Sequence, residues 1–100
     1  MLPAVLVPLY CEKIFSDEQI VDSLFVAAGI GQVIANRASI SGAEGGCQAE
    51  IGAASAMAAG TLVHLFKGTP TQIMYAVGFA LQNVLGLVCD PVAGLVEIPC

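Results

Sequence analysis

The chain has 100 residues, enough for one domain at most, and a formal net charge of −5 with only three basic residues. Lys13, Arg37 and Lys67 form no basic patch, which argues against nucleic-acid binding. Charged residues make up 11% of the sequence and apolar residues 57%, too few polar side chains to cover a free-standing globule. A membrane protein, an obligate oligomer and a piece of a larger domain remain compatible with these values.

The residue pattern predicts an all-α bundle of about four helices, followed by an irregular C-terminal segment that bears cysteines. The first helix is expected over about 3–15, with Pro8 inside it as the point of any bend. The second is expected to begin at Ser16, which forms a capping box with Gln19, and to end near Arg37. Its apolar positions recur at helical spacing: Ile20, Leu24, Ala27, Ala28, Gly31 and Ile34.

The third predicted helix covers about 47–66, follows a loop over 39–46, and is expected to stop at Gly68. It carries glycine, alanine and serine on every side, so that neighbouring backbones approach it closely. A helix that is apolar all round belongs at the centre of a bundle. The pattern therefore predicts that this helix is central, and that the chain is the core of something larger.

The fourth predicted helix covers about 70–85, begins with a capping box at Thr69 and Gln72, and stops at Gly86. The uncharged stretch 68–89 is long enough to span a bilayer, but its polar start and the lack of Trp favour a helix outside the membrane. The residues after this helix contain two prolines and are predicted to be extended or looped. The apolar start has no basic segment of the kind found in signal peptides, so a cytoplasmic location is expected.

The chain has four cysteines, and three of them share a setting. Cys47 follows two glycines, Cys89 precedes an Asp-Pro pair and Cys100 follows a proline, so each is expected at a helix end or in a turn. Backbone amides at such places can face a bound sulfur cluster. Cys11 lies inside the first predicted helix and is expected to be structural. On spacing alone, buried or unligated thiols are an equal alternative, because no Cys-x-x-Cys pair is present.

Two stretches, SISGAEGGCQAEIGAASAMAA (39–59) and NVLGLVCDPVAGLVEIPC (83–100), resemble the signature segments of bacterial iron–sulfur L-serine dehydratases, in their alpha chain or catalytic domain. The linking GTPTQIMYAVGFAL and the opening LPAVLVPLYCEKIF are similar to the same family, so the resemblance covers essentially the whole chain. It implies a [4Fe–4S] cluster held by Cys47, Cys89 and Cys100, with one iron left open as a Lewis acid. It also implies β-elimination of water from L-serine to give pyruvate and ammonia.

Polar residues beside the implied ligands are candidates for the substrate site. Glu44 lies three residues before the first ligand and is expected either to face the ligand or substrate, or to cap the third helix. It is also a weak candidate for the general base. Ser39 and Ser41 are candidates for binding the substrate carboxylate, with helix capping as the alternative. Asp90 is expected either to orient the ligand loop or to form an Asp-Pro turn.

His64 is the only histidine, and it lies about four turns, or about 25 Å along the helix axis, from Cys47. It is therefore expected to be a surface or interface residue, and the general base is expected outside this chain. The chain is shorter than the family's catalytic domain, so we expect an inactive fragment that needs the rest of that domain, a beta chain or domain, and an oligomer. The alternative is a non-catalytic helical fragment without a cluster, stabilised by oligomerisation.

Overall fold

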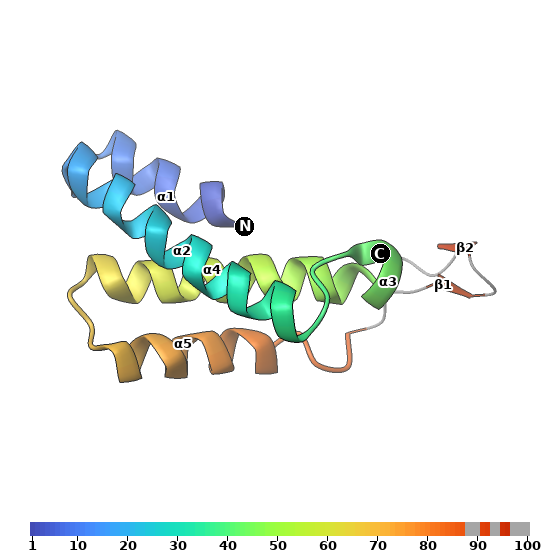
Figure 1. Ribbon diagram of the computed structural model, residues 1–100. Helices are drawn as coiled ribbons and strands as arrows, with labels where there is room; N and C mark the ends of the chain where they lie inside the picture. The colour runs from blue at the N-terminus through green and yellow to red at the C-terminus, as the bar shows by residue number, and fades with distance from the viewer. Residues whose placement is uncertain (88–90, 93–94, 97–100) are drawn as a thin grey trace.

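The computed structural model describes residues 1–87, 91–92 and 95–96, which form an all-α bundle and one short two-stranded ribbon (Figure 1). This confirms the predicted fold class. The helices are α1 (Leu2–Cys11), α2 (Asp17–Arg37), α3 (Gly42–Gly45), α4 (Cys47–Leu65) and α5 (Pro70–Gln82). Strands β1 (Pro91–Val92) and β2 (Leu95–Val96) pair antiparallel, with Pro91 opposite Val96 and Val92 opposite Leu95.

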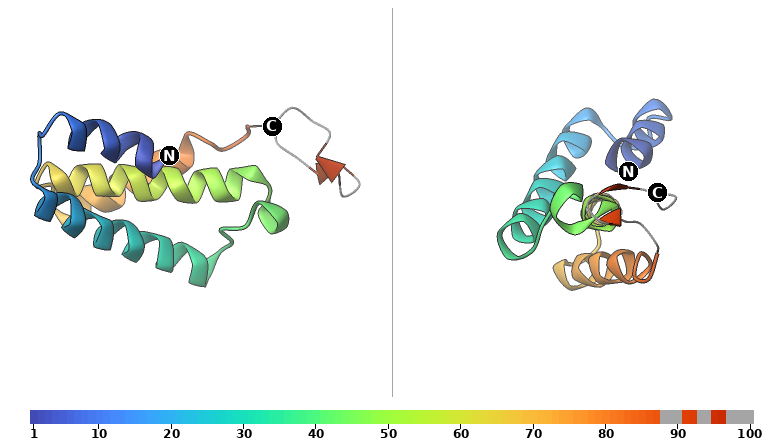
Figure 2. Two further views of the ribbon diagram at one scale, coloured as in Figure 1. Left: turned by 90° about the horizontal axis from the view of Figure 1, so that it is seen from above. Right: turned by 90° about the vertical axis from the view of Figure 1, so that its right-hand side faces the viewer.

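Helix α4 lies at the centre of the bundle, with α1, α2 and α5 arranged around it (Figure 2). A Cβ added at Gly60 would meet side-chain atoms of Ile30 in α2 and Val77 in α5, which would have to shift. The small residues of α4 thus let two helices approach its backbone from different sides, as the sequence predicts. The buried small residues of α4 are Gly52, Ala53, Ala56, Ala58, Gly60 and Thr61.

The face of α2 that packs against the bundle is built on small residues. Ser23 and Ala27 are buried, whereas Leu24 and Ala28, which belong to the apolar spacing of the sequence, are exposed. The hydroxyl of Ser23 donates a hydrogen bond to the carbonyl of Ile20 at 2.6 Å, so this polar side chain is satisfied within its own helix. The buried face of α2 thus contains Ser23 and Ala27, and Leu24 lies off that face.

Helix α1 continues through Pro8 and ends at Cys11, earlier than the sequence predicts. Lys13 adopts the left-handed conformation, with φ of 54°, and the N–H of Ile14 donates to the carbonyl of Leu9 at 3.2 Å. These features are a Schellman motif, which usually has glycine at the left-handed position. The predicted end was wrong because a lysine there gives no stop signal, and Cys11 is exposed at the helix end.

Helix α4 ends in the same way, with Lys67 as the left-handed residue at φ of 62°. The N–H of Lys67 donates to the carbonyl of His64 at 2.9 Å, and that of Gly68 to the carbonyl of Val63 at 2.8 Å. Gly68 marks the stop as predicted, but for a different reason. Its missing side chain makes room for Val63, and the left-handed turn is made one residue earlier.

The helix starts agree closely with the sequence, because their signals are local. In both predicted capping boxes the side chains bond reciprocally to backbone amides, with Gln19 N–H to Ser16 Oγ at 3.3 Å and Ser16 N–H to Gln19 Oε1 at 2.9 Å. The corresponding distances between Thr69 and Gln72 are 2.8 and 3.3 Å. Helix α5 is followed by a turn that reaches Gly86, whose φ is 79°.

Large apolar side chains are exposed on several helices, including Phe25 of α2 at 73% and Phe79 of α5 at 63%. Among the described residues, α2 alone is long and apolar enough to cross a membrane by length and composition. This is weak evidence, because the core helix of a soluble protein passes the same test. Helix α5, which opens the uncharged stretch 68–89, has 13 residues, fewer than the roughly 20 that a spanning helix needs.

Candidate functional site

The loop between α2 and α4 folds back onto the first turn of α4, and glycines at three positions lie along this approach. A Cβ at Gly42 would collide with the carboxylate of Glu50, and one at Gly45 would lie 2.8 Å from the Cβ of Ala49. Gly46 has φ of 79° and ψ of 169°, a conformation that is essentially restricted to glycine. Gly45 and Gly46 are therefore needed for different reasons, whereas the flexible carboxylate of Glu50 could move away from a side chain at position 42.

Cys47 is the first residue of α4 and is half-buried. The preceding Gly46 is the N-cap residue and supplies no side-chain hydrogen bond to the amides of the first turn. The N-terminus of a helix carries a partial positive charge, which favours a thiolate over a thiol. The structure thus places Cys47 at the N-terminus of the central helix, as the sequence predicts.

Ser39, Ser41 and Glu44 lie together in the turn before Cys47. The Ser39 hydroxyl donates to Glu44 Oε2 at 2.7 Å and accepts the N–H of Ser41 at 3.1 Å. Ser41 is the N-cap residue of α3, and its side chain makes no capping hydrogen bond there. These hydrogen bonds join the three residues, and the Glu44 carboxylate bonds to Ser39.

The remaining implied ligands, Cys89 and Cys100, and their neighbour Asp90 lie outside the described residues. Within the part of the chain that the structure describes, no group of three or more His, Cys, Asp or Glu side chains could hold a metal ion. The structure therefore places one of the three implied ligands, Cys47. The ligand set and the roles of Ser39, Ser41 and Glu44 stay predictions.

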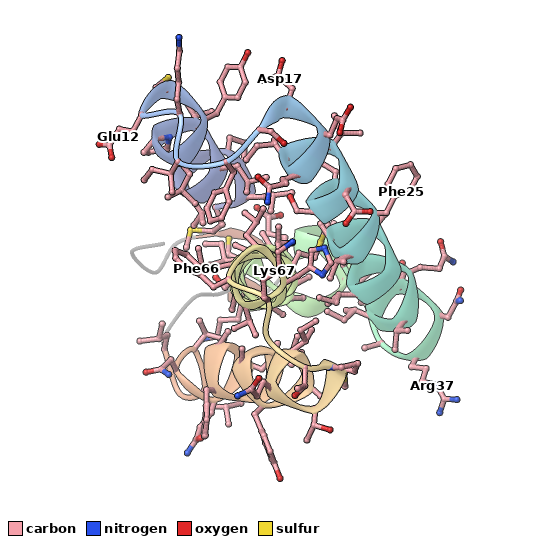
Figure 3. The ribbon with its side chains drawn as sticks, turned by 90° about the vertical axis from the view of Figure 1, so that its left-hand side faces the viewer. Glu12, Asp17, Phe25, Arg37, Phe66 and Lys67 are labelled. Carbon is pink, nitrogen blue, oxygen red and sulfur yellow. The ribbon has the colours of Figure 1, made fainter. Side chains whose placement is uncertain are left out.

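His64 lies in the last turn of α4, at the opposite end from Cys47. Its Nε2 is 2.8 Å from Oδ2 of Asp22, so it connects α4 to α2. The sequence predicts a surface or interface residue, and His64 is 31% exposed at the surface of the bundle. Figure 3 looks at this end of the molecule, where Phe66 and Lys67 follow the last turn of α4.

Glu50 is a residue of this region that the sequence analysis did not select. It lies in the first turn of α4, three positions after Cys47, which places the two residues on neighbouring positions of the helix surface. Its side chain lines a groove of about 370 Å³ between α2 and α4, together with Gln32 and Ile40. Its position three residues after Cys47 was the feature of the sequence that could have identified it.

The family described as "Serine dehydratase alpha chain" matches the sequence over residues 1–100. The chain belongs to the serine dehydratase alpha-chain family. It is 60% identical over 83 residues to the "Probable L-serine dehydratase, alpha chain" of Bacillus subtilis (strain 168), which covers 83% of this chain and 28% of that relative.

Other members of the serine dehydratase family give similar values. Identity is 50% over 100 residues with the "L-serine dehydratase, alpha chain" of Peptoniphilus asaccharolyticus, which covers 100% of this chain and 34% of that relative. It is 54% over 85 residues with the "L-serine dehydratase" of Helicobacter pylori (strain J99 / ATCC 700824), or 85% of this chain and 19% of that relative. The chain thus spans about a third of these relatives' length or less. No solved structure matches it.

Proposed function

We propose that this chain is the cluster-binding part of an L-serine dehydratase, a lyase that removes water from L-serine and gives pyruvate and ammonia. The observation that carries the proposal is the family match over all 100 residues. The structure supports it with a half-buried cysteine at the N-terminus of the central helix, beneath a loop that three glycines shape. We place the enzyme in the cytoplasm.

Cys47, Cys89 and Cys100 would hold a [4Fe–4S] cluster. Cys47, the one of these three residues that the structure describes, fits this role. Iron–sulfur clusters are held by cysteine thiolates, and a helix N-terminus favours the thiolate form. The glycines at positions 45 and 46 keep side chains away from the approach to that helix end. When bound, the cluster supplies an open iron that acts as a Lewis acid toward the leaving hydroxyl group.

The turn before Cys47 would bind the carboxylate of the substrate. Ser39 uses its hydroxyl to donate to Glu44 and to accept from the Ser41 amide, so its part is to fix the turn. Ser41 is half-buried and makes no capping bond, which leaves its hydroxyl as the better donor to a carboxylate. Glu44 holds Ser39 in place and keeps the turn in shape for this contact.

The general base would come from outside this chain. Abstraction of the α-proton needs a base within hydrogen-bond reach of that proton. His64 is unsuited, because it pairs with Asp22 at the far end of α4. Glu44 is exposed and already accepts the Ser39 hydroxyl.

The exposed apolar side chains of α2 and α5 indicate a surface that other parts of the protein cover. Relatives that are about three times as long, and that are called alpha chains, suggest the rest of the catalytic domain and a beta chain or domain. We propose that these parts, in an oligomer, complete the enzyme.

The test is anaerobic reconstitution with iron and sulfide of the complete enzyme that contains this chain. We expect a brown protein with about four irons per chain that forms pyruvate from L-serine, and a 100-residue chain that forms none. A protein that stays colourless after reconstitution, yet assembles into oligomers, would support the non-catalytic alternative instead.

A further inference from the structure

The carboxylate of Glu50 lies beside the loop that contains Ser39 to Gly46. It lies so close to the backbone of Gly42 that a Cβ added there would displace it. Helical side chains point back toward the N-terminus of their helix, and Glu50 follows this rule as it reaches from the first turn of α4 to α3. The side chain thus extends past the level of its own Cα, toward the end of the helix where Cys47 lies.

Glu50 is also the acidic residue of a groove of suitable size for a small ligand. The groove, about 370 Å³ in volume, lies between α2 and α4, and most of its lining residues are alanine or glycine. Gln32 and Glu50 are the polar residues of this lining, and Ile40 lies on the side of the loop. Small side chains leave the carboxylate accessible, and Glu50 is exposed.

The described part of the chain supplies no cation to this carboxylate. Its one ion pair joins His64 to Asp22, at the other end of α4. Lys13 and Lys67 follow the C-terminal ends of α1 and α4, and Arg37 points away from the bundle (Figure 3). A carboxylate beside a groove and without a cationic side chain is suited to a cationic group of a ligand.

We propose that Glu50 binds the ammonium group of the amino-acid substrate. This inference rests on the proposed function and adds a specificity-determining residue to it. The substrate has three groups to recognise: a carboxylate, a β-hydroxyl and an ammonium with three N–H donors. In the proposed function Ser41 binds the first and the open iron the second, and Glu50 supplies an acceptor for the third. An analogue without the ammonium leaves this acceptor unused.

Glu44 is the competing carboxylate, and its contacts make it the weaker candidate. Glu44 Oε2 already accepts the Ser39 hydroxyl at 2.7 Å. Glu50, in contrast, lines the groove, and its carboxylate makes no hydrogen bond to a described residue. The two carboxylates thus differ in role: Glu44 shapes the turn and Glu50 contacts the ligand.

The experiment compares L-serine with 3-hydroxypropanoate, which keeps the carboxylate and hydroxyl but lacks the ammonium. The cluster-loaded enzyme that contains this chain is mixed with each ligand. Affinity is read from the change in cluster absorbance before turnover begins. We expect Glu50→Gln to weaken L-serine binding tenfold to hundredfold, because a charge-assisted hydrogen bond is lost, and to leave the affinity for 3-hydroxypropanoate unchanged. Glu50→Asp, which keeps the charge, should restore part of the preference for L-serine.

The matched control is Glu18→Gln, which removes another first-turn acid, at the start of α2, and should leave both affinities unchanged. Three results overturn the inference: equal weakening of both ligands by Glu50→Gln, loss of the preference on Glu44→Gln with Glu50→Gln unaffected, or a wild-type enzyme with no preference for L-serine. A loaded wild-type enzyme that forms no pyruvate would instead refute the proposed function. Normal pyruvate formation with an unchanged preference in Glu50→Gln refutes the inference alone.

Discussion

The two ends of α4 are built by different means. At the C-terminal end, Lys67 closes the last turn with backbone hydrogen bonds, and Phe66 packs edge-on against Phe15 with ring centroids 5.3 Å apart. His64 adds a contact to α2. At the N-terminal end, Gly46 offers no capping side chain, and the glycine-rich loop lies over the first turn.

This difference suggests that the C-terminal end of α4 stabilises the fold and that the N-terminal end is the one suited to a ligand. A helix end whose backbone groups are satisfied internally has little left to offer a ligand, whereas an end without a side-chain cap can present its amides and dipole to one. Lys67 lies at the satisfied end, and Glu44, Cys47 and Glu50 lie at the other. The comparison predicts large functional effects from changes at the N-terminal end and small stability effects at the C-terminal end.

The largest effect is expected for Cys47→Ser in the reconstituted enzyme. Loss of a ligand should remove most of the iron and sulfide and lower activity by at least about a hundredfold, more than the tenfold to hundredfold typical of residues that only support a ligand. The control is Cys11→Ser, whose exposed thiol lies at the end of α1. Iron analysis measures cluster content in both variants. Retention of the cluster in Cys47→Ser together with its loss in Cys11→Ser would show that Cys11, and not Cys47, is the ligand.

Gly46→Ala tests the loop without touching a ligand. A side chain at φ of 79° and ψ of 169° is strained, so we expect the free energy of unfolding to fall by about 1–3 kcal/mol. The matched control is Gly78→Ala in α5, where an added Cβ meets nothing within 4 Å. That change should stabilise the chain by about 0.5–1 kcal/mol, because alanine is the better helix former. Urea unfolding followed by circular dichroism measures both, and equal effects would show that the loop tolerates side chains.

The sequence predicted the parts of this fold whose signals are local. Both capping boxes and the centrality of α4 follow from residue types a few positions apart. The end of α1 and the turn α3 were missed, because lysine occupies a glycine-type position in one case and glycines adopt helical geometry in the other. Glu50 was not selected for another reason: its approach to Gly42 requires the loop to fold back over α4, which no local pattern shows.

Lys67→Gly tests the stability of the C-terminal end of α4. The left-handed conformation costs a residue with a side chain roughly 1–2 kcal/mol, and glycine avoids this at some cost in chain entropy. We therefore expect stabilisation of about 1 kcal/mol or less, with no effect on cluster content. Gly68→Ala is the opposite control, because its Cβ would lie 2.9 Å from the carbonyl oxygen of Val63 and should destabilise the chain. Destabilisation by Lys67→Gly would mean that the lysine side chain itself supports this end.

The smallest effect is expected for the His64–Asp22 pair, measured by a double-mutant cycle of His64→Gln and Asp22→Asn. The atoms lie 2.8 Å apart, but the side chains are 31% and 69% exposed, so water screens the interaction. Exposed pairs of this kind contribute about 0.2–1 kcal/mol, and we expect a coupling energy in that range that decreases as salt is added. Because the pair lies about 25 Å from Cys47 along α4, neither variant should change cluster content or the affinity for L-serine. A loss of activity in His64→Gln with stability unchanged would contradict the division between the two ends, and would make His64 a candidate for the proton transfer that we assign to residues outside this chain.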